Sequence, residues 1–135
     1  MSEVKYGTGA IDGRAGLVQH LERLRPFAAN PKLLKALQAR MLECFNQKHQ
    51  LGLMECANPL QSFDETGFDW IVILINCDPE STRLIRALPD LRALAAQLPS
   101  IRVRVATSHF MGFGLWDDSM LDLDAFIKRY GTRPY

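Results

Sequence analysis

The sequence predicts one small, helix-rich α/β domain over residues 1–135, with a small, mostly parallel sheet flanked by helices. The clearest evidence is the unbroken apolar run 69–77, which is typical of a strand buried on both faces of a sheet. Leucine then recurs at helical spacing over residues 84–98, and residues 101–107 alternate like a strand with one buried and one polar face. This order predicts a right-handed βαβ unit over about 69–108.

The first half of the chain predicts two helices. From residue 12 or 14 to Arg25, leucine and valine recur at steps of three and four, and Pro26 is expected to end that helix. Asn30 followed by Pro31 is a strong start signal for a second helix, which should run to about residue 49. The buried stripe expected on this second helix consists of Leu34, Leu37, Met41 and Phe45.

The second half predicts two more helices. Pro89 interrupts the leucine pattern, so we expect a kink or two short helices in series. The last helix should be capped near residues 117–119 and end at Gly131.

A two-stranded sheet would be marginally stable, so a third strand is expected. Residues 4–6 and 51–57 are the candidates within the chain, and a partner chain is the alternative source. Residues 1–11 are otherwise expected to be flexible or to form an edge segment.

Composition and charge exclude several classes of protein. A hydrophobic content of 47% and a charged content of 23% are ordinary for a globular domain, which excludes collagen-like, disordered and disulfide-dense chains. No apolar run approaches the ~18 residues of a membrane-spanning helix, so no membrane partner is expected. The net charge of +1 and the absence of nucleic-acid-binding motifs predict no nucleic-acid partner. The N-terminus does not resemble a signal peptide, which predicts a cytoplasmic protein with reduced thiols.

No cofactor or metal is expected. The glycines of segment 7–13 have the spacing GxGxxxG rather than the dinucleotide-binding GxGxxG, and a helix is expected where the second strand should begin. No CxxC or HxxxH pair occurs. The side chains that most often bind transition metals are scattered along the chain as Cys44, Cys56, Cys77, His20, His49 and His109.

Charge is arranged in blocks along the chain. The balance is +5 over residues 14–48, −6 over 49–82, +4 over 83–104, −4 over 117–124 and +3 over 128–133. One interpretation is a pair of oppositely charged faces that bind a charged partner or a second copy of the chain. The other, which is the usual outcome for charge runs, is that the blocks fold against each other as surface ion pairs.

A thiol site is one candidate for chemistry. Cys77 and Asp78 follow one predicted parallel strand and His109 follows the next, so all three should lie at the same edge of the sheet. A helix N-terminus directly after Cys77 would lower its thiol pKa, His109 could act as general base, and Asp78 could orient the imidazole. The simpler interpretation is a core cysteine, a capping aspartate and a loop histidine.

Two candidate binding features remain. The glycine-containing loop 110–116 carries Phe110, Phe113 and Trp116, which could form a hydrophobic docking surface. Arg102 and Arg104 share the polar side of their strand and could hold a carboxylate or phosphate. The favoured alternative is that these arginines pair with Asp69 or Asp117, or that they cover an exposed sheet edge against aggregation.

The sequence therefore predicts a cytoplasmic protein-binding or regulatory domain that acts through its charged faces and the loop 110–116, with a protein partner or a homodimer and no catalysis of its own. The alternative is a small thiol-dependent enzyme or redox-responsive protein that uses Cys77 with His109. A third hypothesis places a small anionic ligand at residues 78–81 with Arg102 and Arg104.

Overall fold

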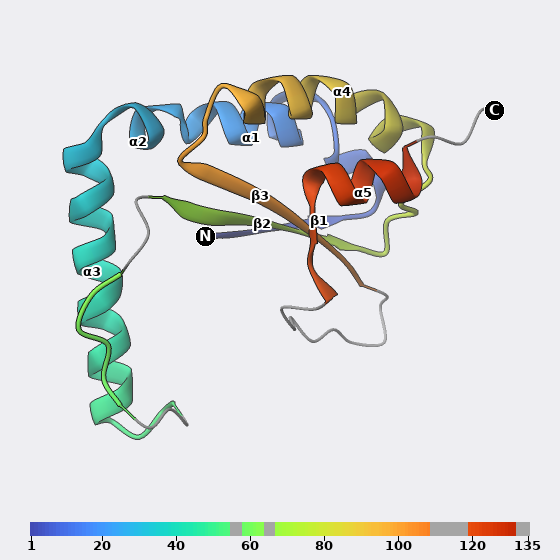
Figure 1. Cartoon of the computed structure of the whole chain (residues 1–135). Coiled ribbons are helices and arrows are strands. Elements are labelled where there is room, and N and C mark those ends of the chain that lie inside the picture. The colour runs from blue at the N-terminus through green and yellow to red at the C-terminus, as the bar shows by residue number, and fades with distance from the viewer. Residues whose placement is uncertain (55–57, 64–66, 109–118, 132–135) are drawn as a thin grey trace.

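The computed structural model describes residues 1–54, 58–63, 67–108 and 119–131 and shows a mixed α/β fold (Figure 1). This confirms the predicted class. The four strands lie in the order β1-β2-β3-β4, with β1–β2 and β2–β3 parallel and β3–β4 antiparallel. Their bounds are β1 Ser2–Tyr6, β2 Phe68–Ile75, β3 Ile101–Ser108 and β4 Leu121–Asp122.

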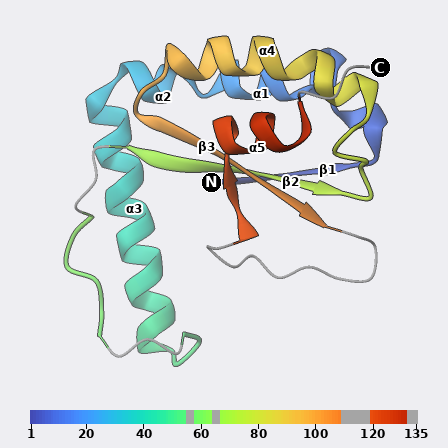
Figure 2. The same cartoon turned by 45° about the vertical axis from the view of Figure 1, so that its right-hand side comes forward.

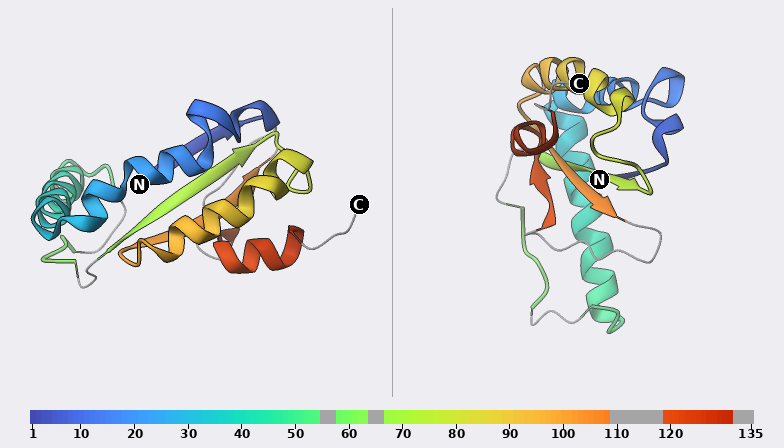
Figure 3. Two further views of the ribbon diagram at one scale, coloured as in Figure 1. Left: turned by 90° about the horizontal axis from the view of Figure 1, so that it is seen from above. Right: turned by 90° about the vertical axis from the view of Figure 1, so that its right-hand side faces the viewer.

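The core lies between one face of the sheet and three helices, α1 (Leu17–Arg23), α4 (Thr82–Ala96) and α5 (Leu123–Tyr130). Seen from above, α1 and α4 run side by side over the strands (Figure 3). The two-residue period of the strands turns alternate side chains to this face, where β2 and β3 are paired in parallel register. The strand residues that enter this core are Trp70, Val72, Leu74, Ile101, Val103 and Val105.

Proline acts differently from the prediction at two positions. Pro26 does not close a long helix, because α1 ends at Arg23 and Pro26 lies in the first turn of α2 (Arg25–Ala29). A first-turn proline loses no helical hydrogen bond, since its missing N–H would have no partner there. Pro89 does not divide α4, which continues through it as one helix. Leucines on both sides of Pro89 are buried in the core, which favours one continuous helix over two short ones: Leu84, Leu88, Leu91 and Leu94.

The N-terminal segment agrees with the prediction of an edge strand, whereas the last helix begins later than predicted. Residues 1–11 form β1, which confirms residues 4–6 as the third strand, and then the turn η1 (Thr8–Ala10); a second turn, η2 (Gly13–Ala15), precedes α1. The other candidate for a third strand is the segment 51–57. Its described part, residues 51–54, contains no strand. The last helix begins at Leu123 rather than near 117–119, because the residues just before it pair with β3 as β4.

Helix α3 (Pro31–Gln50) extends away from the sheet at the amino ends of the parallel strands (Figure 2). The Asn30 side chain caps it by accepting hydrogen bonds from the backbone N–H groups of Lys32 and Leu33 at 3.1 and 3.3 Å, as predicted. The predicted buried stripe is wrong, because only Leu34 is buried and Met41 is 43% exposed. No helix in the described part of the chain, α3 included, combines the length and apolarity needed to cross a bilayer.

Candidate functional site

The carboxyl ends of β2 and β3 lie side by side, which is where the sequence places a thiol site. The backbone N–H of Asn76 donates to the carbonyl of Ser108 at 3.0 Å, directly beyond the register pair Ile75–Ser108. Asn76 has a φ of 53°, an uncommon conformation for a residue other than glycine, and it turns the chain out of the sheet. His109 lies outside the described residues, so the predicted pairing of Cys77 with His109 is not described.

The surroundings of Cys77 are those of a core thiol. Its side chain belongs to the hydrophobic core, and the residue is 7% exposed. Burial raises the pKa of the Cys77 thiol, the charge of Asp78 raises it further, and the nearby Ser81 side chain opposes both effects in part. The expected lowering by a helix N-terminus is wrong, because α4 begins only at Thr82. Asp78 instead accepts a hydrogen bond from the N–H of Glu80 at 2.9 Å and closes a local turn.

These surroundings predict selective alkylation. In native protein at pH 7.5, iodoacetamide should label Cys44, which is an exposed free thiol on α3, and leave Cys77 unlabelled until the protein unfolds. Peptide mass spectrometry over a pH series measures both rates. Because the Cys77 thiol is buried and its pKa is raised, its labelling in folded protein should remain slow throughout the pH series. Fast labelling of Cys77 at neutral pH in folded protein would contradict its assignment to the core and favour the thiol-site hypothesis.

The two arginines of β3 share a carboxylate, as the favoured alternative predicts. Arg102 contacts Asp69 through two hydrogen bonds of 2.7 and 3.1 Å, and Arg104 lies 3.6 Å from the same carboxylate. Arg104 also donates to the carbonyl of Met120 at 3.1 Å. Burial opposes ionisation of Asp69, but the hydrogen bonds and charge of the two arginines outweigh it and hold the pKa of Asp69 below its usual range.

This arrangement corrects the hypothesis of an anion site at residues 78–81 with Arg102 and Arg104. Arg102 lies opposite Asp69 near the start of β2, whereas residues 78–81 follow its end. A strand of eight residues spans about 25 Å, so Arg102 lies at the opposite end of the sheet from residues 78–81, and Arg104 lies at mid-strand, where it contacts Asp69 and the carbonyl of Met120.

Several charge blocks fold against each other. Arg92 pairs with Asp124 at 2.7 Å, and Arg83 lies 3.9 Å from Asp12. With the Asp69 cluster, these contacts join the basic block 83–104 to acidic residues from three other parts of the chain. For this block, the interpretation as surface ion pairs describes the structure.

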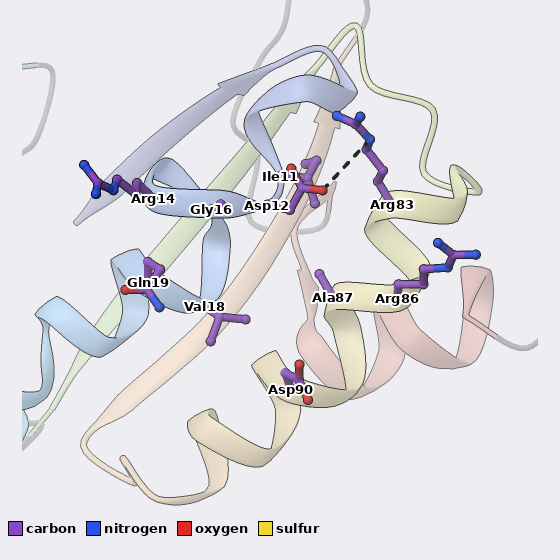
Figure 4. A pocket seen from close by; sticks show the side chains of 11 residues that line it. Ile11, Asp12, Arg14, Gly16, Val18, Gln19, Arg83, Arg86, Ala87 and Asp90 are labelled. Carbon is purple, nitrogen blue, oxygen red and sulfur yellow. Dashed lines mark ion pairs between the residues drawn. The ribbon is translucent and has the colours of Figure 1, made fainter.

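One hollow lies between α1 and α4, near the carboxyl ends of β1 and β2 (Figure 4). Its volume is about 760 Å³, and its apolar part is formed by Ile11, Val18 and Ala87. Arg14 and Arg86 point away from each other on opposite sides, while Arg83 reaches Asp12 across the mouth (Figure 4). A small-molecule site needs polar groups that converge on the ligand. The arginine side chains around this hollow do not converge, so the hollow lacks this property.

A second hollow, which we call the α3 groove, lies between α3, the segment 60–63 and the amino ends of β2 and β3. Its volume is about 510 Å³. Four large apolar side chains at this groove stay partly exposed: Met1 at 44%, Met41 at 43%, Phe63 at 41% and Leu60 at 38%. The other lining residues are Gln38, Ser62, Gly67, Phe68, Asp69 and Arg102. The floor is therefore apolar, and the Asp69–Arg102 pair supplies a polar edge.

Amide side chains of α3 hold the opposite wall of the groove in place. The Asn46 amide donates to the carbonyl of Leu60 at 2.8 Å and accepts from its N–H at 2.9 Å. Gln38 donates to the carbonyl of Gly67 at 3.4 Å. A Cβ atom on Gly67 would lie only 2.3 Å from the carbonyl oxygen of Ser100, so glycine allows the chain to approach the start of β3. Hydrogen bonds therefore connect α3, on one side of the groove, to the segments at Leu60 and Gly67 on the other side.

Sequence reasoning missed the α3 groove and placed the docking surface elsewhere. The predicted binding residues Phe110, Phe113 and Trp116 lie outside the described residues, as does His109. The groove was missed because apolar residues at helical spacing were interpreted as a buried stripe. Helical spacing shows that residues share a face, but it does not show what covers that face.

Within the described residues, no group of three or more histidine, cysteine, aspartate or glutamate side chains could hold a metal ion. Neither protein-family models, nor curated proteins, nor solved structures give a significant match to this chain.

Proposed function

We propose that this chain is a protein-binding domain whose α3 groove receives large apolar side chains from a segment of a partner protein. The observation that carries the proposal is the set of four partly exposed apolar side chains, Met1, Met41, Leu60 and Phe63, around one groove. Apolar surface gathered in this way, with a polar edge, is characteristic of interaction sites rather than of ordinary protein surface.

Three properties support a peptide segment as the occupant. The wall opposite α3 is held by the hydrogen bonds of Asn46 and Gln38, so little ordering is needed when a partner binds. Met1 and Met41 can adjust to differently shaped apolar side chains, because methionine is unbranched and flexible. The Asp69–Arg102 pair at the edge can exchange hydrogen bonds with the main chain of a bound segment.

The proposal also includes three finer predictions from the sequence. These are a regulatory role, a cytoplasmic location and a contribution of the loop 110–116 to binding. The free thiol exposed at Cys44 suits a reducing compartment.

The test is selection of ligands from a phage-displayed peptide library on immobilised protein, followed by titration of a labelled selected peptide. We expect selected peptides to contain large apolar anchors and to lose at least ~30-fold in affinity, about 2 kcal/mol, for the Met41→Asp variant. Ala39→Asp is the matched control, because Ala39 is exposed on the same helix and does not line the groove. Its affinity should stay within about threefold of the parent protein.

Two results would overturn the proposal. One is a library that yields no peptide dependent on the folded domain. The other is a set of peptides that bind the Met41→Asp and Ala39→Asp variants equally well, which would place their site elsewhere. Circular dichroism of both variants checks that the fold is intact.

A further inference from the structure

In the described part of the chain no strand pairs with the outer edge of β1, and this edge offers a second interaction surface, separate from the α3 groove. The N–H of Ile71 donates to the carbonyl of Met1 at 2.8 Å, and the N–H of Gly7 donates to the carbonyl of Ile75 at 2.9 Å. In a parallel ladder, alternate residues of a strand bond to the same neighbour, so Met1, Glu3, Lys5 and Gly7 turn their main-chain groups to β2. The N–H and C=O groups of the intervening residues therefore point outward from the sheet, in which β1 is an edge strand (Figure 3).

Those outward residues are Ser2, Val4 and Tyr6, and their side chains are also exposed, Val4 at 54% and Tyr6 at 59%. None of them is charged. Proteins usually protect an exposed sheet edge with lysine, glutamate or proline on the edge strand. In β1 the charged side chains, Glu3 and Lys5, are turned away from solvent, with exposed fractions of 14% and 4%. The strand thus offers six main-chain groups with no charge to repel an added strand.

We propose that β1 pairs with β1 of a second copy of this chain, antiparallel and about a two-fold axis, to form one continuous eight-stranded sheet. The register follows from the residues. With Val4 opposite Val4 of the second copy, Ser2 faces Tyr6, and all three outward residues of each strand form hydrogen-bonded pairs.

The same register matches charge. It sets Glu3 opposite Lys5 of the second copy in the closely spaced, non-hydrogen-bonded position. Because Glu3 and Lys5 already pair within each chain, this register places unlike rather than like charges beside that pair. A shift by two residues in one direction sets Glu3 against Glu3, and a shift in the other direction sets Lys5 against Lys5. Either shift also leaves only two of the three hydrogen-bonded pairs. Charge and hydrogen bonding therefore select one register, and that register is self-complementary.

The first experiment measures mass in solution by sedimentation velocity over a hundredfold range of protein concentration. The parent chain should shift toward twice its mass of 15.3 kDa as concentration rises. Val4→Pro should remain at 15.3 kDa, since it removes an edge N–H that the monomer does not use. Val4→Thr keeps the N–H and the strand propensity and should still dimerise. Leu51→Asp, at an exposed position outside the sheet, should behave like the parent.

The second experiment tests the register by disulfide formation in a Cys44→Ser, Cys56→Ser background. Val4→Cys should cross-link with itself, because paired Cα atoms lie about 5.5 Å apart, within the span of a disulfide. Ser2→Cys and Tyr6→Cys should each cross-link poorly alone and well when mixed. Hydrogen exchange should show slowed amides at Val4 and Tyr6 at high concentration. A 15.3 kDa mass at every concentration, or a dimer that survives Val4→Pro, would overturn the proposal.

Discussion

Replacing Glu3 by leucine is expected to lower the free energy of unfolding by about 3 kcal/mol. Lys5 is 3% exposed, and its ammonium group contacts the Glu3 carboxylate at 2.5 Å and the carbonyl of Ala15. His20 contacts the same carboxylate through its Nδ1 atom. Loss of Glu3 leaves a buried ammonium with one neutral acceptor, and an uncompensated charge away from water is among the most destabilising single changes.

The double variant Glu3→Leu/Lys5→Met separates this cause from a general effect on β1. It removes both charges and fills their space with apolar side chains, so most of the lost stability should return. Urea unfolding followed by circular dichroism measures both variants, at one protein concentration because association would itself stabilise the fold. If the double variant is as unstable as Glu3→Leu or more so, the loss comes from strand packing and not from the unpaired charge.

The fold class could be predicted because its signals are local. The apolar run 69–77 and the alternation in 101–107 are properties of single strands, and they match β2 and β3 closely. The Asn30 cap of α3 is equally local, since a side chain contacts the backbone two and three residues ahead. Even the sharing of Asp69 by Arg102 and Arg104 follows from the two-residue period of a strand beside a neighbour that carries one carboxylate.

What could not be predicted depends on partners that are distant in the chain. Lys5 is buried because η2 and Glu3 offer it acceptors, and nothing in the segment 1–11 distinguishes it from an exposed edge lysine. The side of α3 that carries Met41 is partly open because the helix leaves the sheet domain, whereas the side of α4 that carries Leu91 is covered. Both helices show the same periodicity, so only the packing decides which face is covered.

The candidate sites show the same contrast between features that follow from local sequence patterns and features that depend on residues distant in the chain. Sequence reasoning brought the ends of β2 and β3 together correctly, because parallel strands joined by a helix must end at one edge. It could not determine the environment of Cys77, since four residues separate that thiol from the start of α4 and the core covers it. The α3 groove joins residue 1 to residue 102 and had no signal in any one segment.

Replacing Trp70 by alanine is expected to lower the free energy of unfolding by about 4 kcal/mol, the largest loss predicted for this chain. Trp70 is 2% exposed and lies opposite Val103 on the helix-covered face of the sheet, so its removal leaves a cavity that neighbours on rigid strands cannot fill. Trp70→Phe should lose less, because a ring remains. Unfolding in urea should be followed by circular dichroism rather than by tryptophan fluorescence, because the substitutions remove one of the fluorescent tryptophans.

Ile71 provides the control, because it is the next residue of β2 and points to the other face of the sheet, where it is only half-buried. Ile71→Ala should cost less than half as much as Trp70→Ala, about 1–2 kcal/mol. The run 69–77 predicts burial on both faces, and the structure shows this in part: the helices α1, α4 and α5 cover one face, while on the other face Ile73 is buried and Ile71 is only half-buried. Equal losses at the two positions would therefore support equal burial of the two faces, and unequal losses support a core concentrated on the helix-covered face, since the other face carries both the buried Ile73 and the exposed Val4.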